Sequence, residues 1–155
     1  MRATYRVMAF LIVGLVMVQA AAIVFADFGF NEWIDQGGVL DKATMEAAME
    51  SGEIPFAGVY GYIIHGLAGQ FLIPLVALVL LVVSFFAKVP KGVLLAGIVF
   101  GLIVLQVVLA LSGIPALGAL HGINALAIFA MAMVAASRAK SPSLDAPIGV
   151  SAGAR

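Results

Sequence analysis

The chain has 155 residues, of which 64% are apolar and 10% carry a charge, and its eight basic and eight acidic residues give a formal net charge of zero. Soluble domains average about 45–50% apolar and about 25% charged residues, so this composition excludes a soluble globular protein, a disordered chain and a basic nucleic-acid-binding protein. The chain has no cysteine, which excludes disulfides, iron–sulfur clusters, thiolate metal sites and a cysteine nucleophile. We therefore expect an integral membrane protein.

Four apolar runs are long enough to cross a bilayer, whose hydrocarbon core of about 30 Å requires about 20 helical residues. The predicted spans are residues 7–26, 57–87, 92–111 and 114–136, and none contains a charged side chain. Because backbone in lipid must be hydrogen-bonded internally, these spans are helices. The predicted fold class is an all-α integral membrane four-helix up-and-down bundle. It forms one domain over residues 1–140, followed by a flexible cytoplasmic tail over residues 141–155.

The loop between the first two spans, residues 27–56, has a predicted structure of its own. Asp41 and Gly52 bracket a short extra helix as an N-cap and a stop signal. Met45, Ala48 and Met49 share one face of it, so we expect the helix to lie flat on the membrane, as a lid over the bundle or as a docking element for a partner. Aromatic residues flank the loop as an interfacial belt: Phe28, Phe30, Trp33, Tyr60 and Tyr62.

The net charge of zero hides a complete separation of charges. Under this topology the loop side carries seven acids and Lys42, a net charge of −6, and the opposite side carries seven bases and Asp145, a net charge of +6. The seven bases are Arg2, Arg6, Lys88, Lys91, Arg138, Lys140 and Arg155. The positive-inside rule therefore predicts a multi-pass protein of the bacterial inner membrane with both termini in the cytoplasm.

Both histidines of the chain lie inside predicted spans, where ionisable residues are rare and often functional. His65 and His121 follow the outer ends of spans two and four by similar distances, which places both about 8–10 Å below the outer surface. These spans are diagonal in an up-and-down bundle, with axes about 11–14 Å apart. That gap leaves room for one atom bonded to both rings, and a haem b iron with two axial histidines fits it.

Other interpretations of the two histidines remain open. They can form a structural hydrogen-bonded pair, contact a quinone, or bind copper with help from a methionine. Zinc is disfavoured because it needs three or four protein ligands and the spans contain no cysteine or carboxylate.

Small and polar residues around the histidines are candidate cofactor-binding residues: Gly61, Gly69, Gly118 and Asn124. Glycines beside a ligand leave a flat groove for a macrocycle, although they equally allow two helices to pack closely. Asn124 lies one turn from His121, where it can orient the imidazole or bond a neighbouring helix. Gln70 lies about 140° around an α-helix from His65, which favours a hydrogen bond to another helix over a place beside the histidine.

Three short motifs carry a resemblance to known proteins. They are Tyr-x-x-His-Gly-x-x-Gly over residues 62–69, Leu-Gln at 105–106, and Leu-His-Gly-x-Asn-Ala over residues 120–125. They resemble a family of small four-helix bacterial membrane proteins of unassigned function, over spans two to four. The layout is also similar to four-helix b-type cytochromes and haem-bearing membrane anchors of respiratory enzymes. This resemblance implies haem ligation by His65 and His121, whereas the acidic loop departs from the family's pattern.

Two functions follow as expectations. The first is an electron-transfer protein or subunit that binds haem b near the outer face. The alternative is a non-catalytic accessory subunit of a larger membrane complex, with structural histidines. No nucleotide-binding loop or catalytic triad is visible, and no span carries the charge typical of a transporter. As partners we expect the lipid bilayer and other membrane-protein subunits, with a quinone as a further candidate and no nucleic acid.

Overall fold

The computed structural model describes residues 1–140, which form helices and no strand. The elements are α1 (Arg2–Asp35), α2 (Lys42–Ser51), α3 (Val59–Leu67), the π-helical turn η1 (Ala68–Leu72), α4 (Ile73–Ser84), α5 (Gly92–Leu111) and α6 (Pro115–Arg138). Four helical segments are long and apolar enough to span a membrane, with α3, η1 and α4 acting as one. The predicted all-α bundle is confirmed. The predicted tail, residues 141–155, lies outside the described residues.

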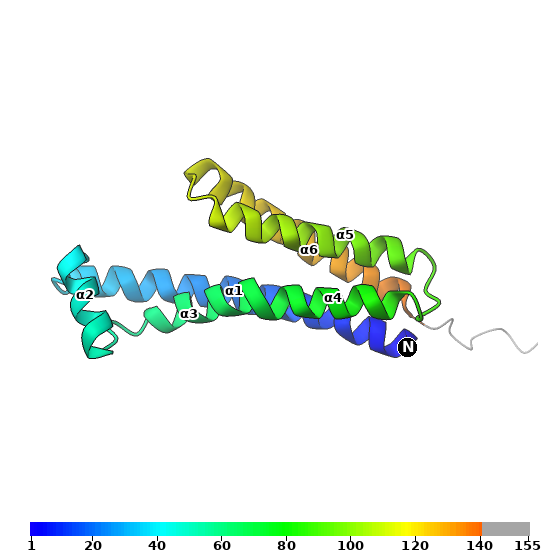
Figure 1. Ribbon diagram of the computed structural model, residues 1–155, viewed down its shortest axis with the longest axis horizontal. Coiled ribbons are helices and arrows are strands. Elements are labelled where there is room, and N and C mark those ends of the chain that lie inside the picture. The colour runs from blue at the N-terminus through cyan, green and yellow to red at the C-terminus, as the bar shows by residue number, and fades with distance from the viewer. Residues whose placement is uncertain (141–155) are drawn as a thin grey trace, which may run out of the picture.

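The four spanning segments form two hairpins. In the first hairpin α1 packs against α3 and α4, and in the second α5 packs against α6. Contacts of α1 with α6 and of α4 with α5 join the hairpins. Figure 1 shows that the hairpins run together near the N-terminus and separate toward the other end of the molecule. We call the end that carries α2 the acidic end, and the end that carries residues 1–6, 85–91 and 138–140 the basic end.

The hydrophobic core fills the half of the bundle nearest the basic end. Its fully buried side chains include Tyr5, Ile12, Leu80 and Val99, with alanines of α6 between them. The hydroxyl of Tyr5 donates a 3.1 Å hydrogen bond to the carbonyl of Gly92 and so ties α1 to α5. Most other large apolar side chains of the four segments are exposed on the isolated chain, as a surface in contact with lipid requires.

The acidic end confirms the predicted extra helix and corrects the length of the first one. The Asp41 side chain caps α2 by accepting a 2.8 Å hydrogen bond from the Thr44 amide, which lowers the pKa of the Asp41 carboxyl. Gly52 ends α2 in the left-handed region, with φ of 71°. Helix α1 continues to Asp35, well beyond the predicted span end at residue 26. The length of an apolar run predicts only the part of a helix that lies in the hydrocarbon core. The helix itself can continue beyond that part, as α1 does.

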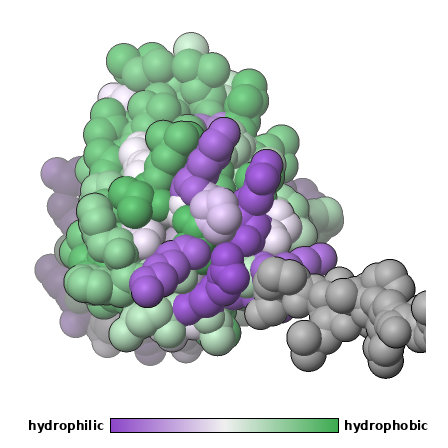
Figure 2. All heavy atoms as spheres, turned by 90° about the vertical axis from the view of Figure 1, so that its right-hand side faces the viewer, coloured by the Kyte–Doolittle hydropathy of each residue, from purple (hydrophilic) through white to green (hydrophobic). Residues whose placement is uncertain are grey.

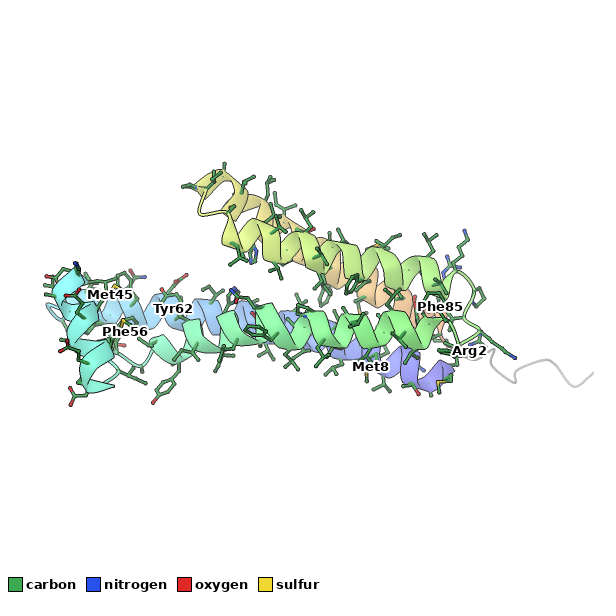
Figure 3. The ribbon with its side chains drawn as sticks, viewed as in Figure 1. Arg2, Met8, Met45, Phe56, Tyr62 and Phe85 are labelled. Carbon is green, nitrogen blue, oxygen red and sulfur yellow. The ribbon has the colours of Figure 1, made fainter. Side chains whose placement is uncertain are left out.

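Aromatic packing fixes the loop to the end of α1. The ring of Trp33 stacks on Phe56 with centroids 5.1 Å apart, and Phe30 contacts both. The Tyr62 hydroxyl donates a 2.9 Å hydrogen bond to the Asp27 carboxylate. Figure 3 shows Tyr62 on α3, with Phe56, from the loop between α2 and α3, and Met45 nearer the end of the molecule. The acidic end is therefore built on the first hairpin.

A π-helical turn interrupts the second span between α3 and α4. Pro74 has no N–H and cannot make the usual bond to the carbonyl four residues earlier. The amide of Ile73 instead bonds the carbonyl of Ala68, five residues back. This wider turn shifts the phase of α3 relative to α4. Such π turns are frequent at functional sites, and the sequence prediction of one continuous span, residues 57–87, missed this one.

Glycine lets α3 lie directly against α1. A Cβ at Gly61 would overlap the carbonyl oxygen of Ala22, and a Cβ at Gly58 would overlap that of Ala26. Close backbone approach through small residues is a usual way in which membrane helices associate. Gly61 therefore acts in helix packing within the first hairpin.

We predict that Gly61→Ala lowers the free energy of unfolding by about 1–3 kcal/mol, because the methyl group must push α3 away from α1. The matched control is Gly97→Ala in α5, where an added Cβ meets nothing within 4 Å. Unfolding of the purified protein in mixed micelles by titration with sodium dodecyl sulfate measures both. Equal stability of the two variants would show that the contact does not hold the hairpin together.

Candidate functional site

A cavity of about 530 Å³ lies between the two hairpins where they begin to separate. Residues of α1, α3, η1, α4, α5 and α6 line it, and Ile73, Ile103 and Ile128 separate it from the core. The wall is apolar apart from five side chains: Gln19, His65, Gln70, Gln106 and His121. This volume lies within the range of about 300–1,000 Å³ that is usual for sites of small molecules and cofactors.

Each histidine is held by the other helix of its own hairpin. Nδ1 of His65, on α3, lies 3.1 Å from the backbone carbonyl oxygen of Gln19 on α1. Nδ1 of His121, on α6, lies 3.1 Å from the backbone carbonyl oxygen of Gln106 on α5. A carbonyl only accepts, so Nδ1 carries the proton in both rings. In a neutral imidazole Nε2 then has a free lone pair.

The two hairpins repeat the same arrangement. In each, a glutamine of the first helix offers its backbone carbonyl to the histidine of the second. The Gln19 side chain donates to the carbonyl of Ile64 at 3.5 Å, and the Gln106 side chain accepts from Asn124 at 2.7 Å. Each histidine is followed by glycine. The cavity is thus built from two matching halves, a relation that the sequence alone did not reveal because the pair spacings differ, 46 residues against 15.

The histidines face each other across the gap between hairpins. Their ring centroids are 6.1 Å apart and their planes are tilted by 55°. The prediction that the rings of spans two and four approach each other therefore agrees with the structure.

The predicted glycine groove is only partly where the sequence placed it. Gly69 lines the cavity, and a Cβ there would lie 3.2 Å from the Gln19 side chain. Gly61 instead packs on α1, and Gly118 is not part of the wall. The residues directly after the histidines, Gly66 and Gly122, line the cavity with open space where a Cβ would be. The cavity wall next to each histidine ring therefore has no side chain projecting from it at these two positions.

Asn124 lies outside the cavity wall and ties the second hairpin together. Its side-chain amide donates to the carbonyl of Leu102 at 2.8 Å and to Oε1 of Gln106 at 2.7 Å. Asn124 therefore fixes α5, which carries the acceptor for His121, against α6. Asn124 makes no hydrogen bond to His121 itself and can influence that ring only through the position of α5.

Gln70 lies in the cavity wall, where its angle from His65 on a regular α-helix did not place it. Gln70 lies inside the η1 turn (Ala68–Leu72), where the angle per residue differs from that of a regular α-helix. Pro74 is the sequence signal that could have revealed it, because a proline inside an apolar helix must disturb the turn before it.

The cavity offers two imidazoles and, among the described residues, no larger ligand set. Among residues 1–140, no group of three or more His, Cys, Asp or Glu side chains could hold a metal ion. A bare zinc ion usually needs at least three protein ligands, whereas a haem iron takes only its axial ligands from the protein. Comparisons with protein-family models, curated proteins and solved structures find no match to this chain.

We predict that Asn124→Leu destabilises the protein by about 1–2 kcal/mol, since hydrogen bonds between membrane helices contribute up to about 1.7 kcal/mol. Ile123→Leu is the control, because Ile123 is exposed on the neighbouring position of α6. The same detergent titration measures the loss. If Asn124→Leu unfolds at the wild-type denaturant fraction, these bonds do not hold the second hairpin.

Proposed function

We propose that this chain is an integral membrane protein that binds one haem b between its two hairpins, with His65 and His121 as the axial ligands, and that it transfers single electrons within the membrane. The four long apolar helices make it a membrane protein. Bound iron would supply a one-electron redox couple, and the residues of this chain would hold and orient it.

The observation that carries the proposal is that a hydrogen bond to Nδ1 holds each of the two histidine rings in place. Metal-binding histidines almost always donate their second ring N–H to a carboxylate, carbonyl or water, which fixes the tautomer and the ring orientation. Both histidines have this partner at 3.1 Å, in the form of a backbone carbonyl. Both rings line one cavity with their centroids 6.1 Å apart, so His65 and His121 would both be able to hold a haem iron there.

The surroundings of the rings favour a flat apolar group. Glycine follows each histidine, and Ile73, Ile103 and Ile128 close the cavity toward the core. An apolar shell around a redox centre limits its contact with water and helps set its potential.

The charge distribution suggests how the protein is oriented in the membrane. With the basic end in the cytoplasm, the cavity lies in the outer half of the bilayer of a bacterial inner membrane. Electrons would then pass between a carrier in the membrane, such as a quinone, and an acceptor at the acidic end or in a partner subunit.

The test is an absorption spectrum of the purified protein after expression with haem supplied. We expect a Soret band that shifts in His65→Ala and in His121→Ala and is lost when both are replaced. Gln70→Leu is the matched control, because it removes another polar side chain of the same cavity and should leave the band unchanged. A wild-type protein with no Soret band, or a band that survives the double replacement, contradicts the proposal.

A second candidate is a non-catalytic accessory subunit of a larger membrane complex. The Nδ1 hydrogen bonds favour it too, because a purely structural histidine would make the same bonds. It predicts that both histidine replacements leave assembly with a stable partner intact and that the protein carries no haem. Native mass measurements on the gently solubilised protein decide, and a free monomer that carries haem excludes this candidate.

A further inference from the structure

A second cavity, of about 410 Å³, lies at the basic end, far from the histidines. Its lining is Arg2, Ala3, Arg6, Val7 and Phe10 of α1, with Ala139 just beyond α6. Figure 2 shows hydrophilic side chains gathered at this end, with hydrophobic side chains around them. Figure 3 locates Arg2 there. The cavity thus combines two guanidinium groups with apolar wall.

Arg2 has donor capacity that the described residues do not use. Its Nη2 makes a long hydrogen bond of 3.4 Å to the carbonyl of Lys88. Its Nε is buried and has no hydrogen-bond partner within residues 1–140. Leaving a buried donor unpaired is costly, and charged donors cost most. We therefore expect the guanidinium group of Arg2 to bind an acceptor from outside residues 1–140.

Arg6 places a second guanidinium on the same face, because residues four apart on a helix are neighbours. Its Cζ lies 5.5 Å from the ring centroid of Phe10, which holds the side chain by a cation–π contact. Two adjacent guanidiniums match the oxygens of a phosphate group better than they match a single neutral acceptor. The first turn of α1 also presents unbonded N–H groups and the positive end of the helix dipole.

The charge around the cavity strengthens this preference. All charged side chains of the described residues at the basic end are basic: Arg2, Arg6, Lys88, Lys91, Arg138 and Lys140. The exposed side chains of Val7 and Phe10 continue the cavity along α1 toward the membrane interior. A ligand that fits both parts has an anionic head and an apolar tail.

We propose that Arg2 and Arg6 bind the phosphate of an anionic phospholipid, with an acyl chain lying along Val7 and Phe10. Basic pockets on membrane helices at the cytoplasmic side recognise anionic headgroups in this way. The inference does not depend on the proposed haem site, because the two cavities share no lining residue.

The experiment is native mass spectrometry of the solubilised full chain incubated with equal amounts of phosphatidylglycerol and phosphatidylcholine. We expect retained phosphatidylglycerol to exceed phosphatidylcholine, and the double variant Arg2→Gln, Arg6→Gln to retain about tenfold less of it. The double variant Lys88→Gln, Lys91→Gln is the control, since it removes the same charge from the same end outside the cavity. It should retain phosphatidylglycerol within about twofold of wild type.

Three outcomes overturn the proposal. The first is equal retention of the two lipids by the wild-type protein. The second is an equal loss in both double variants, which would indicate general attraction by the basic end. The third is displacement of phosphatidylglycerol by an equal concentration of inorganic phosphate, which would assign the site to a free phosphate ion. Circular dichroism on each variant checks that the helices are retained.

Discussion

Inside a bilayer each buried polar group must find its hydrogen-bond partner within the protein, and in this chain each histidine finds a partner inside its own hairpin. His65 is bonded to Gln19 within the first hairpin, and His121 to Gln106 within the second. In these bonds Nδ1 of each ring is the donor, so Nε2 of each ring can bind a ligand in the cavity between the hairpins. The candidate site follows from this one constraint.

Packing divides the molecule into a closed half and an open half. Toward the basic end, Ile12, Leu80 and Val99 fill the space among the four segments. Toward the acidic end, contact is made within each hairpin, through Gly61 in the first and Asn124 in the second. The hairpins can therefore separate there without loss of their own structure. The core that joins the two hairpins lies in the closed half, and the cavity lies where the open half begins.

The sequence predicted what depends on apolar length, caps and charge. It predicted the four helical spans, the caps of α2 at Asp41 and Gly52, and the approach of the two histidines. It did not predict Gln70 in the cavity wall, because it assumed a regular α-helix and Gln70 lies in the π-helical turn before Pro74. Nor did it separate glycines that pack, such as Gly61, from glycines that line the cavity, since both are small residues near a histidine. That distinction depends on which helix lies opposite.

The most direct test of the account is the electron paramagnetic resonance spectrum of the oxidised, haem-loaded protein. If His65 and His121 both hold the iron, we expect a low-spin ferric signal, because imidazole is a strong ligand. Replacing His121 by glycine should convert this signal to high spin, and added imidazole should restore it. A high-spin wild-type signal, or a low-spin signal that His121→Gly leaves unchanged, would contradict the assignment of both histidines to one iron.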